Sequence, residues 1–164
     1  MCSSDLTAAS DNRRPHDAHP SFAQIIRELS SEEAGVLKWC LSDIQRPMVR
    51  IKLMVAANEW QVLQHNLLQW PDLGERTANE IRSRSAFVDN WDRLGLVDTT
   101  YTEHVAVRQP FSDPYGWVEQ SPGYPAFPKP LDENGQARAF PSVVFDRGVL
   151  RVTDFGQRFL RAVR

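Results

Sequence analysis

Residues 87–97, FVDNWDRLGLV, predict a helix that stops abruptly and turns into a strand. The apolar positions in and before this stretch recur at helical spacing and form one stripe: Ile81, Phe87, Val88, Trp91 and Leu94. Ser83 or Ser85 can cap the start of the helix, because a serine hydroxyl accepts a hydrogen bond from a free amide. Gly95 stands where glycine ends helices, since glycine adopts positive φ without steric strain. We therefore expect a helix over residues 78–94 and a strand directly after it.

The segment that follows this helix predicts the rest of the fold. Two β-rich runs, residues 143–145 and 149–152, flank the short turn 146–148 and indicate a hairpin. Thr153 then suits an N-cap, and a last helix with an apolar face follows it. Many winged helices run in the order helix, strand, loop, returning strand, helix. We expect an α+β fold, namely a small winged-helix-like domain with a small antiparallel sheet and a long Pro/aromatic-rich insertion.

The N-terminal half predicts two helices and a strand. Apolar residues at i, i+3, i+4 and i+7 indicate a helix over residues 20–29. Ser30 and Glu33 then form a Ser-x-x-Glu capping box, which starts a second helix. Alternation of apolar and polar residues predicts a strand over residues 49–55. Residues 57–73 leave two interpretations open, a short amphipathic helix or a second strand followed by a turn.

The chain is long enough for one domain with its own core. It has 164 residues, of which 41% are hydrophobic. We expect residues 1–19, which are polar and aperiodic, to form a disordered tail, and residues 20–164 to form a single domain. Residues 2–6, CSSDL, equal the translation of a widely used sequencing adapter. We therefore hypothesise that the first residues are an artefact and that an upstream segment has been lost, which native codons at the source locus would refute.

Cysteine usage and charge predict a cytoplasmic protein. Cys2 and Cys40 form no disulfide framework, and Cys40 falls in an apolar helical pattern that indicates a small core residue. We find no apolar run long enough to cross a bilayer and no signal-peptide core. The net charge of −2 argues against a dedicated nucleic-acid coat. Five arginines from residue 147 onward, against the single acid Asp154, indicate a solvated helix face with a local positive charge.

The segment 108–142 is unusually long for a loop and rich in proline and aromatic residues. Residues 105–141 hold seven of the eleven prolines. A loop of this length is uncommon in a compact domain unless it is functional or disordered. The segment can lie against its own domain, bind a partner protein or be mobile. Aromatic side chains stabilise an ordered path only when they are buried, either against the domain or against a partner. The candidate partner-binding residues are its aromatic side chains: Phe111, Tyr115, Trp117, Tyr124 and Phe127.

The sequence displays no group of residues that predicts catalysis. It contains no G-x-G-x-x-G, P-loop or G-x-S-x-G motif. His65 and His104 are isolated along the chain, and Asn90 is expected to bond locally beside Gly95. An active site needs convergent acid, base or nucleophilic groups. We therefore expect a protein that is not an enzyme, with no catalytic residue, no metal site and no cofactor.

Three blocks of the sequence resemble a known family. Residues 19–37, which include HPSF and LSSEEA, look like the opening of Abi-alpha, a bacterial family of unknown function. Residues 87–97 are similar to its central φ-D-N-L-x-R-L-G-L signature, where φ is apolar and Trp91 replaces the usual leucine. Residues 152–159, VTDFGQRF, resemble its closing L-T-x-x-G-x-x-F element. The blocks keep the family's order across residues 19–164.

The resemblance implies a role in abortive infection, a bacterial antiphage response, and corresponds to the C-terminal domain of the family. It brings no catalytic residue, cofactor or substrate. Family members usually carry an N-terminal helical region before the first block, which agrees with the loss of an upstream segment. The insertion over residues 108–142 is larger than the family needs.

Two functions compete at this point. The first is a non-enzymatic defence domain that acts through protein contacts, with an unknown partner at the Pro/aromatic loop or at the missing N-terminal region. The alternative is a winged-helix DNA-binding transcriptional regulator, in which the helix over residues 80–94 enters the major groove. In that alternative the phosphate contacts come from arginines: Arg82, Arg84, Arg93 and Arg151. The acids Glu80, Asp89 and Asp92 in the same helix weaken it.

Overall fold

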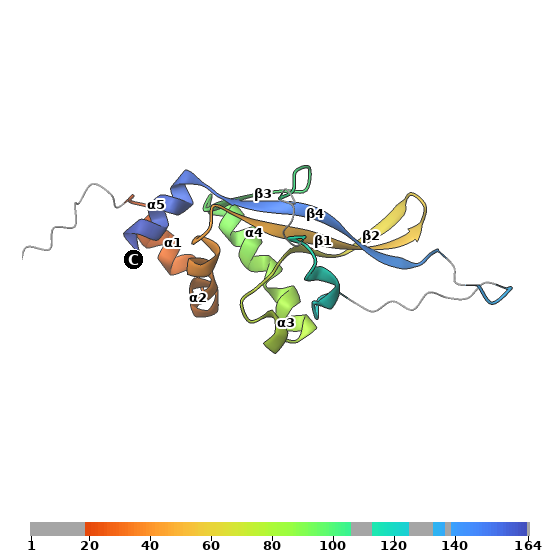
Figure 1. The fold of residues 1–164 in the computed structure, drawn as a ribbon. Coiled ribbons are helices and arrows are strands. Elements are labelled where there is room, and N and C mark those ends of the chain that lie inside the picture. The colour runs from red at the N-terminus through yellow and green to blue at the C-terminus, as the bar shows by residue number, and fades with distance from the viewer. Residues whose placement is uncertain (1–18, 106–112, 125–132, 137–138, 164) are drawn as a thin grey trace, which may run out of the picture.

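A computed structural model describes residues 19–105, 113–124, 133–136 and 139–163 (Figure 1). The fold is α+β, as predicted, and within these residues four strands form one antiparallel sheet of order β2-β1-β4-β3. The strands are β1 (Gln45–Ala56), β2 (Glu59–Leu68), β3 (Val97–Thr100) and β4 (Ser142–Val152). Two of the candidate loop residues, Phe111 and Phe127, lie outside the described residues, as does nearly all of the predicted N-terminal tail.

The predicted hairpin around residues 146–148 is wrong, because β4 is one continuous strand. It pairs with β1 from Gln45↔Arg151 to Met54↔Ser142, so the backbone of the supposed turn is paired with a neighbouring strand. Position 148 requires glycine because another segment of the chain approaches its backbone closely. A Cβ at this position would lie 2.7 Å from the carbonyl oxygen of Thr100 and from the ring of Tyr101. The glycine that suggested a turn therefore permits tight packing between strands.

The open question over residues 57–73 is decided in favour of a strand and a turn. β2 pairs with β1, and their register runs from Met48↔Leu68 to Ala56↔Glu59. A short 3-10 helix, η1 (Leu73–Glu75), follows it. β3 and β4 are also antiparallel neighbours, so the predicted order of helix, strand, long connection and returning strand holds.

The expected helix over residues 78–94 is two helices, α3 (Ala78–Ser83) and α4 (Ser85–Arg93). Neither Ser83 nor Ser85 acts as the cap. Thr77 caps α3 through a capping box with Glu80, and the Ser85 hydroxyl donates to the His65 carbonyl at 2.6 Å. Gly95 ends α4 with φ of +73°, as predicted.

Three further helices gather at one end of the sheet, opposite the β1–β2 turn (Figure 1). They are α1 (Phe22–Glu28), α2 (Ser31–Cys40) and α5 (Asp154–Ala162). The capping box of Ser30 with Glu33 and the N-cap at Thr153 are both confirmed. In the described ranges no helix has the length and apolar character that a bilayer crossing requires.

The core lies between the sheet and the helices and is rich in tryptophan. The Trp70 ring lies 5.8 Å from the Trp39 ring and 6.1 Å from the Trp91 ring, and it links α2 to α4. Cys40 is fully buried, and burial raises the pKa of its thiol to about 12. The predicted role of Cys40 as a small core residue is therefore confirmed, because a reactive thiol needs an accessible, stabilised thiolate.

Candidate functional site

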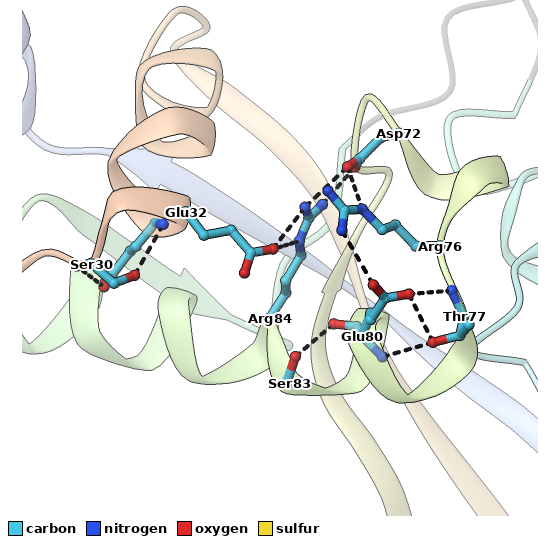
Figure 2. A network of polar contacts seen from close by, with 9 residues as sticks. Ser30, Glu32, Asp72, Arg76, Thr77, Glu80, Ser83 and Arg84 are labelled. Atoms are coloured by element: carbon cyan, nitrogen blue, oxygen red, sulfur yellow. Dashed lines mark hydrogen bonds and ion pairs between the residues drawn. The ribbon is translucent and has the colours of Figure 1, made fainter.

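The most buried charge in the described chain is the guanidinium of Arg84, at the break between α3 and α4. Its side chain is 1% exposed, and it makes a two-pronged ion pair with Asp72 at 2.5 and 3.0 Å (Figure 2). Glu32 from α2 reaches the same guanidinium at 3.1 Å, and the Trp70 ring lies against it at 5.4 Å. Arg84 therefore ties α2 to the segment that precedes α3.

The Asp72 carboxyl in this network predicts acid sensitivity. Hydrogen bonds from Arg84 and, to a lesser extent, Arg76 lower its pKa from 3.8 to about 2. Because the folded-state pKa is depressed, the ion pair contributes fully above about pH 4 and its contribution is lost as the pH falls through about 2. We expect wild-type stability to fall by about 2 kcal/mol more than that of Asp72→Asn over this window. Urea unfolding followed by tryptophan fluorescence measures this, and parallel pH profiles of the two proteins would contradict it.

The three sequence blocks that resemble the family contact one another. Asn90 Nδ2 donates to Glu33 Oε1 at 2.7 Å, which joins the central block to the first one. The Thr153 hydroxyl donates to the Gly95 carbonyl at 2.6 Å, which joins the closing block to the central one. Asn90 also bonds locally, as expected, because its Oδ1 accepts hydrogen bonds from Arg93 at 2.7 and 3.2 Å. The sequence did not indicate its distant partner, the buried carboxylate of Glu33. These signature residues hold the helices together.

His65 also has a partner that the sequence did not indicate. Its Nε2 is 3.0 Å from Asp89 Oδ2, while Asn66 Nδ2 donates to Asp89 Oδ1 at 2.7 Å. The Tyr101 hydroxyl donates to Asn66 Oδ1 at 2.9 Å. His65 is isolated along the chain but not in space, since the end of β2 and helix α4 meet here. A histidine–carboxylate pair can move a proton, but catalysis needs further groups beside it. No group of three side chains able to hold a metal ion occurs within the described ranges.

The described part of the Pro/aromatic segment lies against its own domain. Tyr115 is 1% exposed, and its hydroxyl donates to the Gly148 carbonyl at 2.7 Å. The half-buried Tyr124 donates to the Val143 carbonyl at 2.9 Å, and Trp117 Nε1 donates to the Pro114 carbonyl at 3.0 Å. Tyr115 and Tyr124 therefore tie residues 113–124 to β4, and Trp117 bonds within this stretch. Partner binding by the segment stays a prediction.

The four arginines of the DNA-binding alternative are dispersed among different contacts. Arg84 is enclosed by carboxylates, as described above. Arg93 pairs with Glu28 at 2.5 Å although its side chain is 61% exposed, and Arg151 pairs with Glu103. Arg82 is exposed on α3 and has no ion pair among the described residues. Three of these four side chains are therefore already paired with carboxylates of the chain.

An apolar hollow lies between α1, α2 and α5, at the end of the sheet where these helices gather. Its volume is about 240 Å³. We call it the helical groove and define it by Ile26, Leu29, Leu37, Lys38, Phe159 and Val163, which line it with neighbouring apolar residues. Ile26 and Val163 are 53% and 46% exposed, and Lys38 is the only charged side chain among the described lining residues. Sequence periodicity assigned these apolar side chains to helix faces but did not indicate that they leave a hollow.

A second, smaller hollow of about 210 Å³ adjoins the helical groove. Leu41 and Leu160 line both, and Asp43, Ile44 and Arg161 line only the second one. Ile44 is 76% exposed, the highest exposed fraction of any large apolar side chain in the described chain. Exposed apolar side chains that gather around concave surfaces mark binding sites more often than isolated ones do.

Comparison with known proteins gives a family and no individual relative. No curated protein and no solved structure matches this chain significantly. The family model described as abortive infection alpha matches residues 6–163, which include all three sequence blocks that meet around Glu33, Asn90 and Thr153. The chain therefore belongs to the abortive infection alpha family.

Proposed function

We propose that this chain is an abortive-infection-type antiphage domain that acts by binding another protein and not by catalysis. Membership of the family supports the defence context. The contact-based mode of action rests on one observation, the helical groove. Its apolar lining is open to solvent at Ile26 and Val163, whereas the polar clusters around Arg84 and Asp89 are occupied by internal partners. Apolar hollows between helices commonly receive side chains of a partner.

Phage challenge tests this proposal. We expect Ile26→Glu and Val163→Glu to abolish protection, measured as plaque formation on cells that express the full chain, because each places a charge in the apolar groove. Val55→Glu is the matched control, since Val55 is 47% exposed against 46% for Val163 and lies at the far end of β1. His65→Gln tests catalysis by the His65–Asp89 pair. Protection that survives in Ile26→Glu would refute the proposal, and its loss in His65→Gln would then favour catalysis.

The finer parts of the functional prediction remain proposals as well. A cytoplasmic location suits the absence of a disulfide framework, and the unit from α4 to α5 follows the element order of a winged helix.

The alternative function, DNA binding by a transcriptional regulator, makes a separate prediction. It requires a gel shift at low salt that is lost in Arg82→Glu, the one candidate arginine that is exposed and unpaired in the described chain. Protein binding without a gel shift favours the proposal made here.

A further inference from the structure

We propose that the helical groove receives an amphipathic helix of a partner protein, with acidic side chains beside its apolar stripe. This inference rests on the proposed function, because it assigns a chemistry to the partner that the groove binds. Three helices, α1, α2 and α5, form the groove, so its apolar walls come from helix faces. A helix that presents apolar residues at i, i+3, i+4 and i+7 fits such a groove in a common mode of recognition.

The charges around the groove decide which kind of helix fits. Eight of the thirteen described lysines and arginines form ion pairs within the chain. The described part of the chain leaves five without one: Arg27, Lys38, Arg82, Arg158 and Arg161. All except Arg82 belong to the three groove helices. Lys38 lines the groove itself. Arg161 lines the adjoining hollow together with Asp43, whose carboxylate is paired with Arg46 at 2.8 Å.

The acids of α1 and α2 do not balance these cations. Glu28 is paired with Arg93, and Glu32 with Arg84, so both carboxylates are turned toward α3 and α4. Glu33 is buried and receives hydrogen bonds from Asn90 and Ser30. Within the described chain, the unpaired charges of the three groove helices are therefore four cations and one acid, Asp154 of α5, so these helices carry a net positive charge next to an apolar surface. A partner with acidic residues flanking apolar ones complements both properties.

The same charges argue against a second copy of this chain as the occupant. A symmetric dimer through the groove would bring Lys38 and Arg161 of one copy near the same residues of the other, and like charges at an interface oppose association. An anionic membrane matches the charge but not the shape. Amphipathic surface helices insert a protruding apolar face into lipid, whereas here the apolar residues line a hollow.

A synthetic helical peptide tests the inference with the intact 164-residue chain. The probe is about 20 residues long, with leucines at i, i+3, i+4 and i+7 and glutamates beside them, and its control has lysine at every glutamate position. We expect the glutamate peptide to bind, by fluorescence anisotropy, at least about tenfold more tightly than the lysine peptide. Lys38→Glu and Arg161→Glu are each expected to weaken it by about threefold to tenfold, and Arg82→Glu, the matched control, by less than about twofold. Lys38→Glu is expected to improve binding of the lysine peptide.

Each contrary result has a defined meaning. Equal binding of the two peptides, no binding of either, or equal weakening by Arg82→Glu would overturn the acidic-helix assignment. Tight binding to vesicles of anionic lipid that depends on Lys38 would overturn it in favour of a membrane surface, and concentration-dependent dimers that Ile26→Glu disrupts would overturn it in favour of a second copy. Failure of the peptide test with loss of phage protection in Ile26→Glu overturns only this inference. Retained protection in Ile26→Glu overturns the proposed function itself.

Discussion

Gly156→Ala is expected to destabilise the protein by about 3 kcal/mol or more. A Cβ at this position would lie 2.1 Å from the carbonyl oxygen of Leu96, well inside the contact distance of the two atoms. The obstacle is backbone, and it is held in place because the Leu96 carbonyl accepts a hydrogen bond from the Thr153 amide at 3.1 Å. Helix α5 can accept the methyl group only by moving away from the end of α4. Urea unfolding followed by circular dichroism gives the free energy of unfolding.

Gly35→Ala is the matched control for this substitution. Gly35 also lies in a helix, α2, but a Cβ there would meet no atom within 4 Å. Alanine has the higher helix propensity, so this variant is expected to gain about 0.5–1 kcal/mol. The two glycine-to-alanine changes should thus have opposite signs. Similar stabilities for the two variants would mean that α5 does not pack against Leu96 as the structure has it.

Arg84→Met is expected to cost about 3–5 kcal/mol of stability. Methionine keeps much of the side-chain volume against Trp70 but removes every hydrogen bond to Asp72 and Glu32. Asp72 then remains only 25% exposed without its main counter-ion. Arg76 still pairs with Asp72 at 2.8 Å, but a partly buried carboxylate that has lost its two-fold contact with Arg84 is desolvated at a cost, so the loss should exceed that of an exposed ion pair. Thermal and urea unfolding both measure it.

Arg82→Met is the control for Arg84→Met, because it removes an arginine side chain without removing the ion-pair network. Arg82 lies two residues earlier, is exposed on α3 and has no described ion pair, so its replacement should change stability by less than about 0.5 kcal/mol. Adding Asp72→Leu to Arg84→Met should recover part of the loss, because the carboxylate that lost its main counter-ion is then absent. Purely additive effects of Asp72→Leu and Arg84→Met would show that the two side chains are not coupled.

The parts of the fold that the sequence predicted correctly depend on local interactions. The capping box of Ser30 with Glu33, the cap at Thr153 and the helix stop at Gly95 each involve residues within a few positions of one another. Such interactions need no knowledge of tertiary structure. The continuous strand β4 was missed because its regularity depends on pairing with β1, almost a hundred residues earlier in the chain.

The candidate site was less predictable for the same reason. The sequence predicts a DNA phosphate contact for Arg84 in the DNA-binding alternative, because neither Asp72 nor Glu32 is near it in the helical pattern. In space both carboxylates contact its guanidinium. The pairing of His65 with Asp89 depends on the end of β2 meeting α4. Periodicity marks a residue such as Ile26 as apolar and helical. Whether a third helix covers such a residue or leaves a hollow beside it is a property of tertiary packing.

The position of β4 between β1 and β3 has a consequence for synthesis of the chain on the ribosome. β1 and β2 can form a hairpin as soon as residue 68 has emerged, but the other edge of β1 has no partner until residues 142–152 follow. During that interval β1 presents unpaired amide and carbonyl groups, and such edges are prone to pair with other chains. β3 is equally unpartnered until then, because its neighbour in the sheet is also β4. The sheet is therefore completed late in synthesis, when β4 pairs with β1 on one side and with β3 on the other.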